Sequence, residues 1–210
     1  MNEPVLTIGH SNHSITFFID LLRHYGVTAV SDVRSHPYSR YAPQFSYDAL
    51  REALRGQGIA YAFLGRELGA RSQNPACYIN GKAQYGLIAR EPLFKQGIIR
   101  IRHGIEHYRI ALLCAEKDPL DCHRAILVAR YLVKTGLSVS HIHANYELET
   151  HDSLENRLLK ILNISEDDIF KCRESFIEEA YSVQGQRLAY QDRQMAQQES
   201  VHDRIHDWVC

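Results

Sequence analysis

Arg109-Ile-Ala-Leu-Leu-Cys-Ala-Glu116 leads into Lys117-Asp-Pro-Leu-Asp-Cys-His-Arg124 and then into Ala125-Ile-Leu-Val-Ala-Arg-Tyr-Leu-Val-Lys134. The first part is an apolar run of buried-strand length, and the last part carries apolar residues at helical spacing, so the middle part is a strand-to-helix turn. Asp118 is a good N-cap and Pro119 suits the first helical position, which puts Cys122 in the first turn of the helix. Such a helix end carries free backbone N–H groups and attracts anions.

The same order of strand and helix recurs along the chain. Apolar residues at helical spacing follow the candidate N-caps Ser14 and Ser46, and they occur again over residues 94–107. Strand, helix, strand is the pattern of a parallel sheet with right-handed crossovers. We therefore predict an α/β fold: a mainly parallel five-stranded sheet with helices on both faces, in a Rossmann-like three-layer sandwich. The predicted strands are Val5–Ile8, Thr28–Val33, Ile59–Leu64, Arg109–Glu116 and Ser138–His143.

The predicted domain organisation is a single α/β domain over residues 1–165 and a helical C-terminal extension over residues 166–210. Glycine, asparagine and proline punctuate residues 65–92, which predicts a long loop insertion draped over the carboxyl edge of the sheet. The last part of the extension is too polar to have a core of its own, so we expect it to be flexible. The insertion offers side chains that either grip a ligand or face solvent: Arg66, Arg71, Tyr78, Lys82 and Tyr85.

The composition is that of an ordinary globular protein. The 210 residues are 45% hydrophobic and 23% charged, with a net charge of −1. This balance argues against a protein that coats nucleic acid non-specifically, although it allows a local basic cleft. Five irregularly spaced cysteines, no visible signal peptide and no apolar run of membrane-spanning length predict a cytoplasmic protein with reduced thiols and no membrane partner. The sequence leaves room for a homo-oligomer without fixing the oligomeric state.

Three motifs in order point to one family. They are Thr7-Ile-Gly-His-Ser11, Asp32-Val-Arg-Ser-His-Pro-Tyr-Ser-Arg40 and Cys114-Ala-Glu-Lys-Asp-Pro-Leu-Asp-Cys-His-Arg124, with Gly58-Ile-Ala-Tyr61, Leu64-Gly65 and Tyr181–Tyr190 as further matches. In this order and spacing, over roughly residues 5–190, the chain resembles the prokaryotic family catalogued as domain of unknown function 488. It departs from the family at Arg71, where the family often has paired glycines. The resemblance implies an α/β fold and points to the motif residues, but it brings no settled reaction.

Polar side chains gather where three of the predicted strands end. If these strands are neighbours in a parallel sheet, their carboxyl ends bring the three motifs into one site. Arginines beside a helix N-terminus bind phosphate or carboxylate through forked guanidiniums, and serine hydroxyls add donors. We therefore expect an enzyme, a hydrolase or transferase, that binds a phosphorylated small molecule such as a nucleotide, or a short nucleic-acid end. The predicted ligand-binding residues are Ser11, Arg34, Ser35, Ser39, Arg40 and Arg124.

The same site holds candidates for the chemistry. Glu116 or His123 would handle protons, with His10 as a second imidazole. Cys122 is a candidate nucleophile because a helix N-terminus and a nearby guanidinium lower the pKa of a thiol. The loop differs from the phosphatase and rhodanese cradle, since Arg124 follows Cys122 by only two positions. The predicted catalytic residues are Glu116, Cys122, His123 and His10.

Two alternatives belong to other functional classes. One is a metal-binding protein, because Cys114, Glu116, Cys122 and His123 include ligands suited to zinc. The other is a non-catalytic module that senses a nucleotide or nucleic acid through the same arginines. The favoured hypothesis assigns no metal ligand and leaves the cofactor unknown. The sequence shows no third ligand for a metal at His141 and His143, so we interpret this pair as structural.

Overall fold

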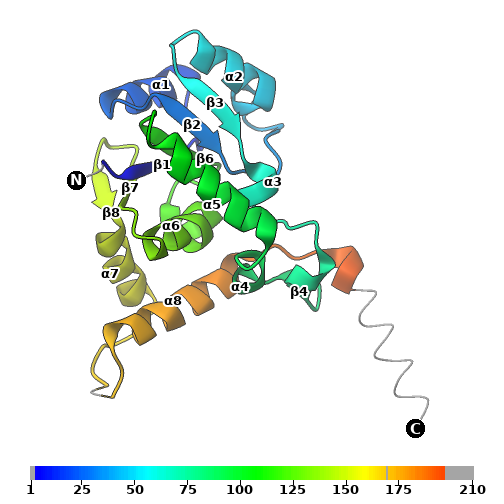
Figure 1. The fold of residues 1–210 in the computed structure, drawn as a ribbon, viewed down its shortest axis with the longest axis vertical. Helices are drawn as coiled ribbons and strands as arrows, with labels where there is room; N and C mark the ends of the chain where they lie inside the picture. Colours follow the sequence, from blue (N-terminus) through cyan, green and yellow to red (C-terminus); the bar gives the residue numbers. More distant parts are fainter. Residues whose placement is uncertain (1–2, 169, 197–210) are drawn as a thin grey trace.

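The computed structural model describes residues 3–168 and 170–196, and over these residues the chain is an α/β protein (Figure 1). The main sheet has six strands in the order β3-β2-β6-β1-β7-β8. All neighbouring strands pair in parallel except β8, which lies antiparallel to β7 at one edge. The strands are β1 Val5–Gly9, β2 Ala29–Asp32, β3 Ala60–Phe63, β6 Ile110–Cys114, β7 Val139–Ile142 and β8 Leu148–Thr150.

Helices cover both faces of the sheet. Helices α1 (Ile15–His24) and α2 (Tyr47–Arg55), with the short turn η1 (Pro43–Phe45), pack on one face in a core that includes Leu6 and Val30. Helices α5 (Pro92–Gly104) and α6 (Arg130–Lys134) pack on the other face, where the core includes Val5 and Ala29. Successive residues of a strand point to opposite faces, so the two cores divide the strands between them. The predicted three-layer arrangement is therefore confirmed.

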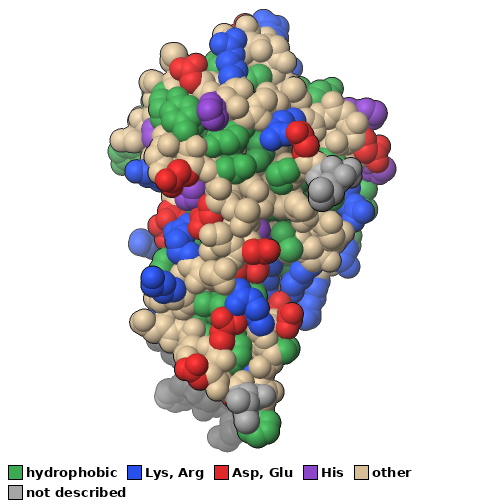
Figure 2. Space-filling view, turned by 90° about the vertical axis from the view of Figure 1, so that its left-hand side faces the viewer, with side chains coloured by type: hydrophobic (Ala, Val, Ile, Leu, Met, Phe, Trp, Pro, Cys, Tyr) green, Lys and Arg blue, Asp and Glu red, His purple; other side chains and the backbone are tan. Residues whose placement is uncertain are grey.

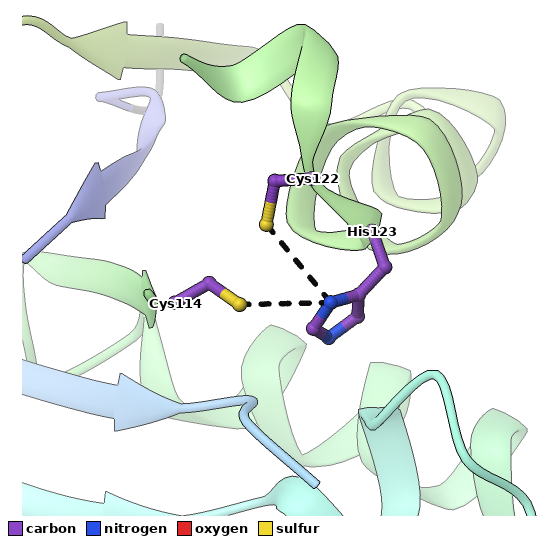
Figure 3. A group of neighbouring side chains, drawn as sticks. All are labelled: Cys114, Cys122 and His123. Carbon is purple, nitrogen blue, oxygen red and sulfur yellow. Dashed lines mark hydrogen bonds between the residues drawn. The ribbon is translucent and has the colours of Figure 1, made fainter. Parts of the chain in front are cut away.

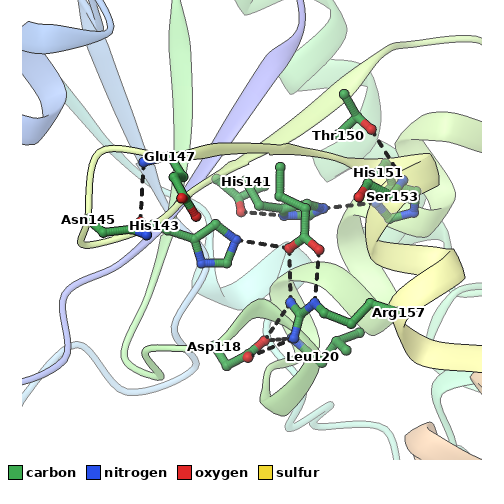
Figure 4. A network of polar contacts seen from close by, with 12 residues as sticks. Asp118, Leu120, His141, His143, Asn145, Glu147, Thr150, His151, Ser153 and Arg157 are labelled. Carbon is green, nitrogen blue, oxygen red and sulfur yellow. Dashed lines mark hydrogen bonds and ion pairs between the residues drawn. The ribbon is translucent and has the colours of Figure 1, made fainter. Parts of the chain in front are cut away.

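The prediction of five strands misses the edge strand β8. Its three residues are too few to show a pattern, and two of them are exposed. Side-chain pairing holds this edge in place (Figure 4). Arg157 of helix α7 (His151–Ile161) donates to Glu149 of β8 from Nε at 2.9 Å and to Asp118 from Nη1 at 2.8 Å, while His143 contacts Glu149 at 2.9 Å. Asp118 and Arg157 are 39 residues apart in sequence, so local periodicity does not reveal their contact.

The turn after β6 differs from the predicted helix start. Asp118 does act as a cap, since its side chain accepts from the N–H of Leu120 at 2.8 Å, but it caps only the short turn η3 (Pro119–Asp121). Cys122 then adopts extended backbone angles, φ −141° and ψ 139°, and the chain re-enters a helix through the π-helical turn η4 (Arg124–Ala129) before α6. Cys122 therefore precedes the second helical segment and does not lie inside the first turn of one continuous helix.

The insertion and the C-terminal extension pack against each other (Figure 1). Residues 65–92 form α3 (Gly65–Leu68), η2 (Pro75–Cys77), the hairpin of β4 (Tyr78–Ile79) and β5 (Lys82–Ala83), and α4 (Tyr85–Ile88). After helix α8 (Arg173–Leu188), the carbonyl of Tyr190 accepts from Ala83 N at 2.9 Å. The last part of the predicted extension, residues 197–210, lies outside the described residues. Among the helices of the described part, none has both the length and the apolar character needed to cross a bilayer.

Candidate functional site

The three strands whose ends carry the sequence motifs are neighbours, in the order β2-β6-β1. Their carboxyl ends therefore lie together, as predicted. A pocket of about 270 Å³ opens at this edge, with walls from the strand-end loops, the insertion and the C-terminal extension. Its lining residues are Arg34, Ser35, His36, Ala70, Arg71, Tyr85, Cys114, Ala115, Glu116, Asp121, His123, Leu188 and Tyr190.

Arg34 lies in the pocket wall as half of a buried ion pair. Its Nε and Nη2 donate to Asp32 at 2.9 and 2.6 Å, and its Nη1 lies 3.2 Å from Nε2 of His10. Asp32 also accepts from the hydroxyl of Tyr61 at 2.8 Å. Because a buried guanidinium needs such a partner, Asp32 balances the charge that was predicted to attract the ligand.

His10 is a buried, fully hydrogen-bonded imidazole and does not line the pocket. Its Nδ1–H donates to the carbonyl of Ser11 at 2.7 Å, Nε2 accepts from Arg34, and the ring stacks on Phe45 with centroids 4.4 Å apart. Burial lowers the pKa of His10 to about 4, so the ring is neutral at pH 7. These contacts place His10 in support of the Arg34–Asp32 pair.

Arg124 is fully buried and holds the loop after β6. Its Nη1 and Nη2 donate to the carbonyls of Glu116 and Lys117 at 2.7 and 3.1 Å, while its Nε has no partner among the described residues. Gly9 lets the loop approach: a Cβ at this position would lie 1.8 Å from the carbonyl oxygen of Glu116. Arg124 thus fixes the backbone of Glu116 through the Glu116 carbonyl. Arg124 itself does not line the pocket.

The other predicted ligand-binding residues divide between the pocket and its surroundings. Ser35 lines the pocket and accepts from the N–H of Arg71 at 3.2 Å. Ser39 accepts from two backbone N–H groups of its own loop, and Arg40 is exposed on that loop outside the pocket lining. Ser11 has a φ of 47° and also lies outside the lining. The structure therefore does not bring Arg34, Arg40 and Arg124 together as one clamp.

The side chains of Cys114, Cys122 and His123 point toward one another (Figure 3), and Cys114 and His123 also line the pocket. The ring Nδ1 of His123 lies 3.6 Å from the sulfur of Cys114 and 3.9 Å from the sulfur of Cys122, and the three ligand atoms all lie within 4.8 Å of one another. The other ring nitrogen, Nε2, donates its proton to the carbonyl of Val33 at 3.0 Å. Nδ1 is therefore the ring nitrogen that faces the two sulfurs. Burial opposes a charge on His123, but the hydrogen bond to Cys122 and the negative charge of its thiolate outweigh burial and raise the pKa of His123.

The surroundings of the sulfurs favour one thiolate. Burial opposes ionisation of Cys122, but a hydrogen bond from Cys114 and the charge of Arg124 outweigh it and hold the pKa of Cys122 well below its usual value. Burial raises the pKa of Cys114, and the neighbouring Cys122 thiolate raises it further. The N–H of Arg124 also donates to the Cys122 sulfur at 3.4 Å. Burial and the Cys122 thiolate raise the pKa of Glu116, whose carboxylate lies next to both sulfurs.

The chain matches one known protein family. The model of the family described as domain of unknown function DUF488 matches residues 14–132, which is more than half of the chain. The chain belongs to the DUF488 family. In this DUF488 protein the matched region contains the β6 turn with Cys114, Cys122 and His123, whereas His10 and the C-terminal wall of the pocket lie outside it. No curated protein and no solved structure matches the chain.

Arg71 and Tyr190 both occur in segments that the sequence analysis names, but the sequence does not predict their contact. Arg71 was one of several basic residues in the insertion, and only the structure shows its guanidinium stacked on the ring of Tyr190, 4.3 Å from the ring centroid. Tyr190 reaches the pocket because the extension folds back over the β4–β5 hairpin. A contact across more than one hundred residues leaves no trace in local spacing, so no sequence pattern could have identified this pair.

Proposed function

We propose that Cys114, Cys122 and His123 bind one zinc ion and that this DUF488 protein is a metal-dependent hydrolase. The observation that carries the proposal is the convergence of two sulfurs and the Nδ1 atom of His123, which would release any proton to the solvent when a metal binds. With Zn–S of about 2.3 Å and Zn–N of about 2.0 Å, the sulfur–nitrogen edges of a tetrahedral site are about 3.6 Å long. The distances of 3.6 and 3.9 Å in the protein match those edges.

The surrounding hydrogen bonds also suit a metal site. Ligating histidines usually donate their second ring N–H to a carbonyl or carboxylate, as His123 does to Val33. A backbone N–H donates to the Cys122 sulfur, which stabilises a thiolate ligand. Three protein ligands leave a fourth position for water, which is the arrangement of catalytic rather than structural zinc sites. Cys114 and His123 line the pocket, so that position would open toward a substrate.

Glu116 is the group we assign to proton transfer. It lines the pocket beside both sulfurs, but it does not belong to the set of mutually close ligand atoms. Zinc lowers the pKa of a bound water, so the Glu116 carboxylate would take a proton as the water attacks and return that proton to the leaving group. Water thereby adds across the bond that breaks, and the carboxylate ends as it began.

A thiol nucleophile fits the geometry less well. Cys122, the cysteine that favours the thiolate, is 1% exposed and does not line the pocket. Cys114 does line the pocket, but its thiol retains the proton. A nucleophile must be both ionised and within reach of the substrate, and these two cysteines divide the two requirements between them.

Metal analysis tests the zinc site directly. We expect the purified protein to contain about one zinc per chain, as a single site implies. Cys122→Ser should lose that zinc and unfold at a lower temperature, because metal binding is coupled to folding. Cys77→Ser is the matched control, since Cys77 is an equally buried free cysteine outside the cluster. Full-length protein that binds no zinc after reconstitution, or a Cys122→Ser protein that keeps it, would sink the proposal.

A further inference from the structure

The loops that border the pocket form a basic rim, which we define as residues 34–41 and 65–71. Both loops supply pocket residues, Arg34, Ser35 and His36 from the first and Arg71 from the second. They are also joined to each other, because the hydroxyl of Ser35 accepts from the N–H of Arg71. The rim therefore forms one side of the pocket.

The rim has a local excess of positive charge. In the first loop Arg40 is exposed, whereas the charge of Arg34 is balanced by Asp32, and no aspartate or glutamate occurs from residue 34 to residue 47. In the second loop Arg66 and Arg71 are exposed, and the single acid, Glu67, pairs with Arg100. By contrast, on the face shown in Figure 2 acidic and basic side chains are interspersed. The net charge of −1 therefore conceals an uneven distribution.

Two tyrosines of the rim project into solvent from a well-defined loop. Tyr38 is 66% exposed and Tyr41 is 100% exposed. The loop between them is held in shape, because the hydroxyl of Ser39 accepts from the N–H groups of Tyr41 and Ala42 at 3.2 and 3.1 Å. A bond from Tyr47 N to the carbonyl of Pro37 at 2.8 Å anchors the loop to α2. Neither ring contributes to the core, so both rings are free to contact a ligand.

We infer that the basic rim binds single-stranded nucleic acid and delivers it to the pocket, which makes a nucleic-acid strand the substrate class of this protein. Unpaired strands are bound by a positive groove that follows the phosphates and by aromatic rings on which bases stack. Arg40, Arg66 and Arg71 supply the cations, and Tyr38 and Tyr41 supply the rings. Arg71 is held against Tyr190 at the pocket wall, where its guanidinium can bind a phosphate. This inference rests on the proposed function, because it concerns the same pocket.

The test measures fluorescence anisotropy of labelled single-stranded DNA and RNA oligonucleotides with the zinc-loaded full chain. We expect the double variant Tyr38→Ala/Tyr41→Ala to bind at least about tenfold more weakly, since each stacked base contributes substantially. Tyr108→Ala is the matched control. Tyr108 is 48% exposed, but it precedes β6 and therefore lies at the amino end of that strand, away from the carboxyl ends where the pocket opens. Arg40→Ala should reduce the slope of the logarithm of the binding constant against the logarithm of salt concentration by about one unit, which corresponds to the loss of one phosphate contact. Lys160→Ala on α7 should leave this slope unchanged.

The outcomes separate this inference from the zinc proposal. Zinc in the wild-type protein without binding of any oligonucleotide would overturn the nucleic-acid inference alone. Oligonucleotide binding that the tyrosine variant retains, or a preference for duplex of the same length, would also overturn it. Binding that survives in zinc-free Cys122→Ser protein would support the rim, because the rim does not depend on the metal. A small phosphorylated ligand would instead appear as competition by a mononucleotide with no effect of the tyrosine substitutions, which would contradict a strand-binding surface.

Discussion

At the scale of single residues, the site depends on which charged groups already have partners. Arg124 is committed to two loop carbonyls and Arg34 to Asp32, so both serve the framework. Glu116 has no such commitment to an arginine or lysine in the described residues, and its carboxylate lies in the pocket. Residues that are free to exchange protons or bind ligand are the ones in which chemistry is expected, and Glu116 is a pocket carboxylate whose pKa is raised by burial and by the neighbouring Cys122.

Glu116→Gln tests the proton-transfer role. We expect the variant to keep its zinc and to lose hydrolysis of chromogenic carboxylate and phosphate esters by about a hundredfold or more, because an amide does not accept the proton. Asp121→Asn is the control, since Asp121 also lines the pocket. Rates and zinc content are measured on the same preparations. A Glu116→Gln protein with unchanged rates would show that Glu116 is not the proton carrier.

The residue types of the site were predictable from sequence, but their roles were only partly so. A cysteine, a histidine and a carboxylate at a strand end predict chemistry, and these side chains do border one pocket. The commitments of Arg34 and Arg124 were not predictable, because short-range motifs do not tell whether a guanidinium faces a ligand or a carbonyl. The zinc alternative required Cys114 at the end of a strand to lie close to Cys122 and His123 at the start of a helix. Spacing along the sequence does not show this closeness, whereas the three-dimensional structure does.

At the scale of elements, strands were easier to predict than the turn that matters most. Each of the five predicted strands occurs, because apolar runs between loop signals are a robust pattern. The β6 turn broke the expected helix into η3, the extended residue Cys122 and η4. That break places the Cys122 sulfur beside Cys114 and His123, so the irregular geometry and the candidate site have the same origin.

The end of β1 controls this turn through Gly9. A Cβ on Gly9 would lie 1.8 Å from the carbonyl oxygen of Glu116, so Gly9→Ala must push the loop away from the sheet. We expect a loss of roughly 1–3 kcal/mol in unfolding free energy and weaker zinc binding, as for an overpacked core. Gly86→Ala, with nothing within 4 Å of its Cβ, should be neutral or slightly stabilising. Urea denaturation and zinc titration of both variants decide the matter, and equal stabilities would refute this account of the turn.

At the scale of the whole molecule, a chain of buried hydrogen bonds ties the C-terminal extension to the sheet. Thr7 contacts His141 at 2.8 Å, His141 contacts His151 at 3.0 Å, and His151 contacts the hydroxyl of Tyr181 in α8 at 2.8 Å. Tyr181 then donates to Glu155 at 3.0 Å. Each group donates in one direction and accepts in the other when both imidazoles are neutral. The interpretation of His141 as a structural residue agrees with these contacts.

This arrangement makes the whole fold sensitive to acid. Burial lowers the pKa of His151 from 6.5 to about 4, against the weaker opposing charges of Asp152 and Glu149, and it lowers the pKa of His10 equally. Above pH 6.5 both histidines are neutral in the folded and in the unfolded chain, so the free energy of unfolding has its full value. As the pH falls from 6.5 to about 4, the unfolded chain takes up protons that the folded chain refuses, and stability is lost.

Each pKa unit corresponds to about 1.4 kcal/mol, so each histidine should remove about 3 kcal/mol of unfolding free energy over that interval. Urea denaturation of the full chain at a series of pH values measures the loss. His151→Gln should be less stable at neutral pH, because it interrupts the hydrogen-bond chain, and its stability should fall less steeply with acid. A wild-type stability that stays constant from neutral pH down to the region of the lowered pKa values would mean that these histidines are not held neutral by the fold. If the predicted loss occurs, His151 both ties the C-terminal extension to the sheet and contributes to the acid limit of the fold.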